Sequence, residues 1–297
     1  MSVPTENRAI AHGTSVTSVT PVTPVALFFP FFPVSRENLQ SMIRLMVCLL
    51  ILLSVSVRAA EPVIDQQTTM PGDFVYLSDV DPTITQNLRY HTANNFMGRQ
   101  VPGYAADRIV CTRRAAEQLK LANDYLKTQG YQFVIYDAYR PLRAVAAFRS
   151  WAEDTDDIVT KPYFYPTHDK ADLFRLGYIA ERFSGHSRGS TFDLTLIATN
   201  TPLQPVNVTQ RLLKDGTQIA YLDDHTVDMG SSFDLLQEAS HHDSPLVAQG
   251  YLAWRNYLRA VMRRYGFNDY AKEWWHYTLA DEPYPNTYFD FVTPADE

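Results

Sequence analysis

Residues 183–196 read FSGHSRGSTFDLTL and predict a tight turn that leads directly into a β-strand. The small residues between His186 and Asp193 favour the turn, and the alternating apolar positions over residues 192–197 predict the strand. A neutral imidazole and a carboxylate are both good zinc ligands, and a turn between them can direct both at one point. An ordinary hydrogen bond would explain the same pair, so a metal site needs further ligands from elsewhere in the chain.

Helices and strands are predicted around this stretch. Residues 112–129 predict a helix, because Thr112 can cap it, one face is apolar and Gly130 can end it. Residues 131–136 then predict a buried strand, rich in aromatic and β-branched residues. The pattern also predicts a loop over residues 161–169 and three more helices, over residues 141–153, 171–182 and 246–265.

The composition is that of a globular protein. The chain has 297 residues, of which 45% are hydrophobic and 13% aromatic, and its formal net charge is -7. This length suits one sizeable domain or two small ones, and the lack of a linker or repeat after residue 60 favours one. An acidic chain without dense basic runs is unlike a nucleic-acid-binding surface, so nucleic acid is excluded as a partner.

Residues 1–59 do not resemble part of that domain. Residues 42–59 predict a secretory signal peptide, with Arg44 before a short apolar run and small residues at the cleavage site. The run is short for a membrane span, and a buried hydrophobic helix is the alternative. Residues 1–41 are then expected to be a non-native or disordered extension, and residues 60–297 the functional domain. The mature protein is expected to be periplasmic, without a stable membrane anchor.

Cysteine usage supports the same compartment. After the predicted signal peptide the chain has a single cysteine, Cys111, which cannot form an internal disulfide. Export without disulfides fits a bacterial periplasm better than a secreted disulfide scaffold.

Residues 137–141 mark the junction between a predicted strand and a predicted helix. Pro141 suits the first turn of that helix, which places Arg140 where a side chain can be held rigidly over a cleft. A fixed positive charge there could stabilise a developing oxyanion. The alternative is a surface arginine that pairs with a carboxylate such as Asp137.

Glu273 and His276 lie three positions apart within an aromatic segment. A straight strand would direct their side chains to opposite faces, so the segment must bend or form a turn with three-residue periodicity. By itself the pair is weak, because core aromatics with an incidental histidine would also explain it. With His186 and Asp193, however, His276 completes a three-ligand zinc site with one open position. Glu273 then becomes the general base beside it.

Ser240-His241-His242 is a second motif that contains histidine. Two adjacent histidines look like a metal site, but neighbours on a regular element point in different directions. Capping or surface positions are therefore expected for them.

The sequence resembles the zinc D-alanyl-D-alanine dipeptidases of the VanX type, and the resemblance covers nearly the whole mature chain. Many segments match in the right order, which makes the resemblance specific. The matching segments are residues 137–141, 184–190, 193–196, 233–234, 240–242, 273–277 and 281–291.

The resemblance implies an α+β fold of the hedgehog/DD-peptidase type, in which helices flank a central, mainly antiparallel sheet. It implies one zinc ion per chain, held by His186, Asp193 and His276. It assigns Glu273 to acid/base catalysis and Arg140 to stabilising the tetrahedral intermediate.

The resemblance also implies substrate contacts. Ser184 and Asp234 would contact a dipeptide, Asp234 through the substrate's ammonium group. Tyr90 and residues 94–98 would form part of the pocket wall.

The expected function is therefore zinc-dependent hydrolysis of the small D,D-dipeptide D-Ala-D-Ala to two D-alanines. An exported dipeptidase would suit D-alanine scavenging or cell-wall turnover, whereas protection against glycopeptide antibiotics would work best in the cytoplasm, where the precursor is made. One alternative is a zinc murein DD-carboxypeptidase or endopeptidase that cleaves longer peptides. Another is a non-catalytic zinc-binding recognition domain.

Overall fold

The computed structural model describes residues 60–294 and four isolated earlier positions, 36, 40, 41 and 44. The predicted extension and signal peptide, residues 1–41 and 42–59, otherwise lie outside the described residues. Contacts group residues 60–297 into one unit, distinct from residues 1–59. Among the described residues, no helix has both the length and the apolar character needed to cross a bilayer.

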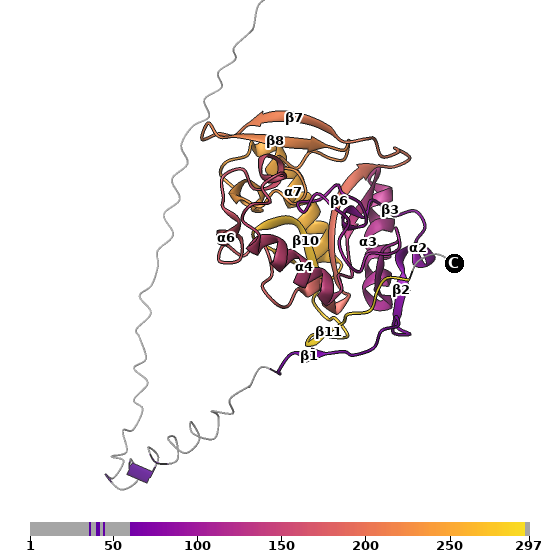
Figure 1. The fold of residues 1–297 in the computed structure, drawn as a ribbon. Helices are drawn as coiled ribbons and strands as arrows, with labels where there is room; N and C mark the ends of the chain where they lie inside the picture. Colours follow the sequence, from indigo (N-terminus) through magenta and orange to yellow (C-terminus); the bar gives the residue numbers. More distant parts are fainter. Residues whose placement is uncertain (1–35, 37–39, 42–43, 45–59, 295–297) are drawn as a thin grey trace, which may run out of the picture. The chain divides into compact units, whose positions relative to one another are not determined.

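A five-stranded sheet lies at the centre of residues 60–294 (Figure 1). β3 runs parallel to β5, and the other three neighbouring pairs are antiparallel. The strands, in their order across the sheet, are β3 (Thr85–Gln86), β5 (Tyr131–Asp137), β6 (Thr191–Ala198), β10 (Glu273–Leu279) and β9 (Phe267–Tyr270).

The strands predicted over residues 131–136 and 192–197 correspond to β5 and β6 and are confirmed. Every residue of β6 except Ala198 is buried. Both faces of this strand must therefore be covered, which agrees with its run of apolar and small polar residues. The combination of this sheet with separate helices agrees with the α+β class.

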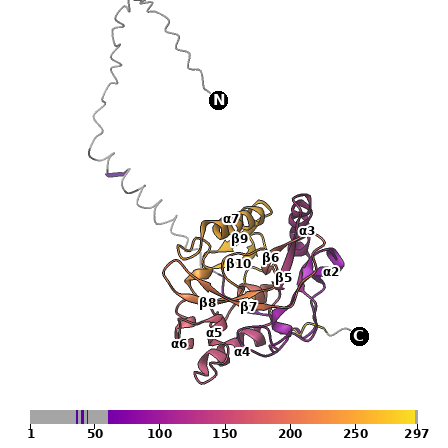
Figure 2. The same ribbon diagram turned by 90° about the horizontal axis from the view of Figure 1, so that it is seen from above.

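Helices α3 (Arg113–Thr128) and α7 (Gln249–Arg264) cover one face of the sheet, as Figure 2 shows. Thr112 caps α3 by accepting a hydrogen bond from the Ala115 N–H at 3.4 Å. Gly130 follows the end of α3 with φ +83°. Both helices confirm the predictions from sequence. The apolar face of α3 is fully buried and includes Ala115, Leu119, Ala122 and Leu126.

Shorter elements lie over the opposite face (Figure 2). Helix α4 (Leu142–Glu153) confirms the helix predicted after Pro141. The loop predicted over residues 161–169 is wrong in part, because it contains the one-turn helix α5 (Lys161–Phe164). A hairpin of β7 (Asn207–Leu212) and β8 (Gln218–Asp223) was not predicted. Nearly all of β7 is exposed, so its sequence lacks the apolar alternation of a half-buried strand.

The helix predicted over residues 171–182 is wrong. Only the one-turn helix α6 (Lys170–Leu173) forms there, and Gly177 adopts a left-handed conformation with φ +80°. The Gly177 carbonyl accepts a hydrogen bond from the Tyr270 hydroxyl at 3.0 Å instead of from a helical N–H. A Cβ on Gly177 would lie 2.9 Å from that hydroxyl. A contact with a distant strand therefore overrides the local helical pattern.

Short elements complete the described fold and hold the C-terminal tail in place. β1 (Val63–Ile64) pairs in parallel with β11 (Thr287–Tyr288), and β2 (Phe74–Tyr76) pairs with β4 (Val110–Thr112). The remaining one-turn helices are α2 (Leu77–Val80) and the 3₁₀ turns η1 (Arg89–His91), η2 (Gly185–Arg188) and η3 (Glu238–Ser240).

Candidate active site

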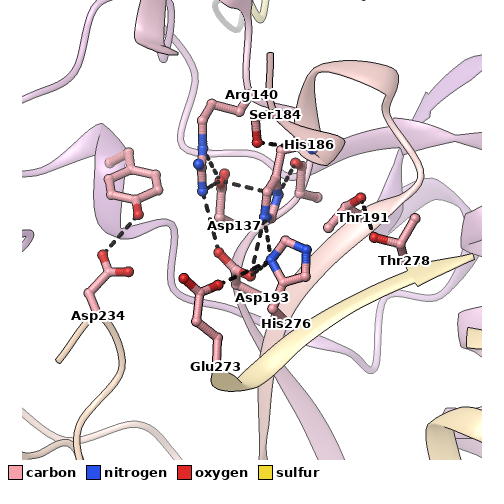
Figure 3. Close-up of polar contacts among 12 residues, drawn as sticks. Asp137, Arg140, Ser184, His186, Thr191, Asp193, Asp234, Glu273, His276 and Thr278 are labelled. Carbon is pink, nitrogen blue, oxygen red and sulfur yellow. Dashed lines mark hydrogen bonds and ion pairs between the residues drawn. The ribbon is translucent and has the colours of Figure 1, made fainter. Parts of the chain in front are cut away.

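Strand pairing brings residues from distant parts of the chain together. His276 on β10 lies directly opposite Asp193 on β6 in the antiparallel ladder. On its other side, the ladder with β9 is interrupted between Glu273 and Tyr277. This bulge supplies the bend that the spacing of Glu273 and His276 requires, and Figure 3 shows both side chains directed toward one centre.

Three potential metal-ligand atoms converge at this centre. Asp193 Oδ1 lies 3.2 Å from His186 Nε2 and 3.1 Å from His276 Nδ1, and the two nitrogens lie 3.2 Å apart. Tetrahedral zinc with bonds of about 2.0–2.1 Å separates its ligand atoms by about 3.3 Å. Asp193 Oδ1 is buried and has no hydrogen-bond partner, which is expected of a ligand reserved for a cation. The residues present therefore fit a zinc ion.

His186 is held in the tautomer that a metal ligand needs. Its turn, η2, is capped at the N-terminal end by Ser184, whose Oγ accepts a hydrogen bond from the His186 N–H at 3.3 Å. The His186 Nδ1–H donates to the Ala138 carbonyl at 2.8 Å, so the lone pair of Nε2 faces the centre. Burial lowers the pKa of His186, which keeps the ring neutral and able to bind a metal.

The pKa values of the two carboxyl groups at the centre shift in opposite directions. Burial acts to raise the pKa of Asp193, but the adjacent His186 and His276 outweigh it and hold that pKa below its ordinary value. Glu273 Oε2 lies 3.4 Å from His276 Nδ1. Burial, together with the charges of Asp193 and Asp234, raises the pKa of Glu273 well above its ordinary value. Asp193 therefore suits cation binding, and Glu273 accepts a proton more readily than an ordinary carboxyl group does.

Arg140 faces the same centre and is held there by buried carboxylates. Its Nε donates to Asp137 at 2.9 Å, and its Nη2 lies 2.8 Å from Asp137 and 3.4 Å from Asp193. Asp137 is fully buried and also accepts a hydrogen bond from the Tyr104 hydroxyl at 2.8 Å. The pairing with Asp137 considered from the sequence does form, but the Arg140 side chain is only 11% exposed and lines the pocket instead of the surface.

Asp234 reaches the pocket from a separate, irregular segment. Its backbone has φ +59°, a conformation uncommon for a residue with a side chain. Its Oδ2 accepts a hydrogen bond from the Tyr90 hydroxyl at 2.8 Å. Burial and the charge of Asp193 raise the pKa of Asp234 to about 8. A cationic group of a ligand would stabilise the ionised form of this carboxyl group.

The raised pKa of Asp234 predicts that Asp234→Asn stabilises the metal-free protein as the pH rises. Between its ordinary pKa of 3.8 and about 8, the native Asp234 keeps a proton that the unfolded chain releases. Native stability therefore falls through this window, by at most about 1.4 kcal/mol per pH unit. Asparagine has no proton to lose, so the variant should unfold at a higher urea concentration than the unmodified protein at pH 8 and show a much smaller gain at pH 5.

The exposed Asp156 provides the control for this comparison. Asp156→Asn should leave the urea midpoint within error of the unmodified protein at both pH values. A gain from Asp234→Asn that is equal at pH 5 and pH 8 would contradict the raised pKa.

All seven site residues predicted from the sequence line one pocket of about 340 Å³, namely Arg140, Ser184, His186, Asp193, Asp234, Glu273 and His276. Tyr90 lines it as expected, and Phe96 does so from residues 94–98. The sequence did not reveal the apolar wall, because its aromatic residues have the same spacing as core residues. This wall includes Phe148, Tyr178, Tyr270 and Trp275.

His186, Asp193 and His276 form the ligand triad, and His241 and His242 lie outside it. His241 Nε2 lies 2.9 Å from the Tyr178 hydroxyl. His242 is 1% exposed, with its ring 5.8 Å from that of Tyr277, so the expected capping or surface position is wrong for it. Within residues 60–294, the one group of three or more close ligand types is His186, Asp193 and His276.

A family model described as D-ala-D-ala dipeptidase, of the peptidase M15 type, matches residues 70–212 and 214–294. The chain belongs to this family. A D-alanyl-D-alanine dipeptidase of Enterococcus faecium is 38% identical to this M15 peptidase over 218 residues, which cover 73% of this chain and 96% of the relative. One of Streptomyces coelicolor is 40% identical over 222 residues, covering 75% and 98%. One of Escherichia coli is 28% identical over 209 residues, covering 70% and 84%.

Membership of the M15 family confirms the resemblance seen in the sequence and makes the protein a metallopeptidase. The matched residues include every member of the ligand triad and both Arg140 and Glu273. The chain therefore carries, within the family's own region, a group of side chains that can hold a metal ion.

Proposed function

We propose that this M15 peptidase hydrolyses D-Ala-D-Ala to two D-alanines, with one zinc ion held by His186, Asp193 and His276. The convergence of these three ligands beside Glu273 in one pocket carries the proposal. Relatives at 38% and 40% identity that bear the name D-alanyl-D-alanine dipeptidase support this choice of substrate.

Zinc bound here would supply a Lewis acid that polarises the peptide carbonyl and lowers the pKa of water at the site from about 15.7 to about 7. Glu273 takes the proton of the attacking water, as its raised pKa allows, and returns it to the leaving amine. Arg140 donates to the substrate oxygen that gains negative charge as the carbonyl carbon becomes tetrahedral. Because Asp137 already holds the guanidinium, little reorganisation is needed.

Asp234 and Ser184 are the proposed substrate contacts. The Asp234 carboxylate would bind the ammonium group of the dipeptide, and that charge would lower the carboxyl pKa again. The Ser184 oxygen already accepts the His186 N–H, so its own hydroxyl hydrogen can be donated to the substrate.

A murein DD-carboxypeptidase or endopeptidase is the second candidate. Asp234 argues against it, because a buried carboxylate is stabilised by a free ammonium terminus, which an acylated peptide lacks. The placement of Glu273 and Arg140 beside the ligand triad argues against a non-catalytic zinc-binding domain, since a structural site would need neither.

Release of D-alanine from D-Ala-D-Ala and from N-acetyl-D-Ala-D-Ala, each with and without a chelator, tests the proposal. Cleavage of the free dipeptide should be strong, sensitive to the chelator and much faster than that of the acetylated form. Equal cleavage of both would support the murein peptidase. If zinc-loaded protein cleaved neither substrate, the result would support the non-catalytic zinc-binding recognition domain.

Arg140→Ala should lower kcat for D-Ala-D-Ala by about 100- to 1,000-fold, the usual effect of losing an oxyanion donor. Steady-state kinetics would measure this, with the zinc content and thermal unfolding of the variant recorded beside it. Arg149, on the exposed side of α4, is the matched control, and Arg149→Ala should keep normal turnover. Near-normal turnover of a zinc-loaded Arg140→Ala protein would remove Arg140 from the mechanism.

We also propose that the protein is exported and acts in the periplasm, in D-alanine scavenging or cell-wall turnover. The basic residue Arg44, the apolar run after it and the small residues before Ala60 support a signal peptide over residues 42–59. Mass spectrometry of the periplasmic protein should find a mature N-terminus near Ala60. The mainly antiparallel sheet around the ligands is consistent with a fold of the hedgehog/DD-peptidase type.

A further inference from the structure

The segment that carries Asp234 has no regular secondary structure, although it is almost completely buried. Residues 231–236 are between 0% and 7% exposed. Asp234 itself has positive φ, a conformation that persists only when its surroundings enforce it. The groups packed around this segment therefore help to determine where the Asp234 carboxylate points, in addition to the hydrogen bond that it accepts from the Tyr90 hydroxyl.

Two buried serines, Ser231 within the segment and Ser240 beyond it, add hydrogen bonds that hold the segment. The Ser240 hydroxyl donates to the Leu235 carbonyl, next to Asp234, at 2.6 Å. Ser240 Oγ also lies 3.1 Å from Ser231 Oγ. Both serines are at most 1% exposed, so neither hydroxyl is in contact with bulk water.

The chemistry of their neighbours determines the direction of every bond. Ser231 Oγ receives the Trp274 Nε1–H at 3.0 Å and an Arg255 Nη2–H at 3.3 Å. Indole and guanidinium groups only donate, so Ser231 accepts from both and gives its single hydrogen to Ser240. Ser240 then has one hydrogen left to give, and Leu235 receives it.

Arg255 ties the same segment to helix α7. Its side chain is 0% exposed, and it donates to the carbonyls of Met229, Ala239 and His241 at 2.7, 2.8 and 2.6 Å. These carbonyls bracket the segment on both sides of Asp234. Trp274 is adjacent to Glu273 on β10. The hydrogen-bond network therefore connects β10, which carries the proposed base Glu273, to the segment that carries Asp234.

We propose that Ser240 is a positioning residue that, through Ser231, Trp274 and Arg255, holds Asp234 at a defined place relative to Glu273. This rests on the proposed function, in which Asp234 binds the substrate's ammonium group. It also gives a role to the first residue of the Ser240-His241-His242 motif, which the ligand triad leaves unused.

Ser240→Ala removes the hydrogen donated to Leu235 and the acceptor of the Ser231 hydroxyl. The substitution leaves Asp234 less firmly held for binding the substrate's ammonium group, but it does not alter Glu273 or the metal ligands. KM for D-Ala-D-Ala should therefore rise at least about 10-fold while kcat stays within about 3-fold. Slow cleavage of N-acetyl-D-Ala-D-Ala, which lacks the ammonium, should change less than about 2-fold. Ser240→Thr, which keeps the hydroxyl, should recover most of the lost affinity.

Ser244→Ala is the matched control, because Ser244 is also buried but its Oγ accepts from the Leu246 N–H, outside this network. Ser231→Ala interrupts the same hydrogen-bond network between Trp274 and Ser240. It should reproduce the rise in KM if Ser240→Ala does not fold. An unchanged KM in a folded Ser240→Ala or Ser231→Ala protein would overturn the inference, as would an equal loss of kcat on both substrates.

Direct binding separates this inference from the proposed function. Calorimetry on Glu273→Gln protein loaded with zinc should detect D-Ala-D-Ala, and adding Ser240→Ala should weaken it at least about 10-fold. Equal affinity with and without Ser240→Ala overturns the positioning role alone. No binding to Glu273→Gln protein together with no turnover by the unmodified protein overturns the proposed function, and the positioning role with it.

Discussion

Glu273→Gln should lower kcat for D-Ala-D-Ala by about 100- to 10,000-fold, the range for losing a general acid/base, while the protein keeps its zinc. The amide retains the shape of the side chain but cannot take a proton from water. The position of Glu273 supports this outcome, because its Oε2 lies 3.4 Å from His276 Nδ1, beside the ligand triad. Steady-state kinetics and metal analysis of the same preparation would measure both quantities.

The zinc content decides between two roles for Glu273. If the variant loses its metal in parallel with its activity, Glu273 is a ligand and the assignment as base is wrong. Glu181, which is exposed, provides a control, and Glu181→Gln should retain both zinc and turnover. Activity of Glu273→Gln within a few-fold of normal would mean that another group moves the proton.

Removing the metal should abolish hydrolysis and destabilise the fold. Without a cation, the ionised Asp193 and the lone pairs of His186 and His276 face one another within 3.2 Å, and Asp193 Oδ1 has no hydrogen-bond partner. A ligand present at 1,000 times its Kd stabilises the native state by about 4 kcal/mol. The chelated protein should therefore have a clearly lower Tm, and added zinc should restore both Tm and turnover.

His186→Ala tests the same site without a chelator. It should bind less than one zinc ion per chain and show no turnover above background, because two protein ligands hold zinc poorly. The exposed His225 has positive φ, a conformation that asparagine tolerates, so His225→Asn is the control and should bind zinc normally. Full activity of protein stripped of metal would exclude metal-dependent hydrolysis.

Local sequence patterns correctly predicted those helices and strands whose determining signals lie within the element or next to it. α3 has one buried face, a capping threonine and a terminal glycine, and each signal lies within the helix or next to it. The helix predicted over residues 171–182 was wrong because the determining contact, from the Tyr270 hydroxyl to the Gly177 carbonyl, comes from a strand about 90 positions away in the sequence. The β7–β8 hairpin was missed because an exposed strand needs no alternation of apolar residues.

The site shows the same division. His186 and Asp193 are joined by one turn, and the spacing of Glu273 and His276 already required a bend, so these pairs could be predicted from the chain alone. The bulge in β10 supplies that bend. What the spacing could not state is that His276 lies opposite Asp193, because strand register depends on pairing between segments far apart in the chain.

The sequence by itself determined which side chains are available for the proposed chemistry: two imidazoles, two carboxyl groups and an arginine. Only the tertiary structure decided their environment. Burial raises the pKa of Glu273 and lowers that of His186, and the Ala138 carbonyl selects the His186 tautomer. Desolvation and hydrogen-bond geometry arise from the surrounding atoms, and those atoms come together only when the chain has folded.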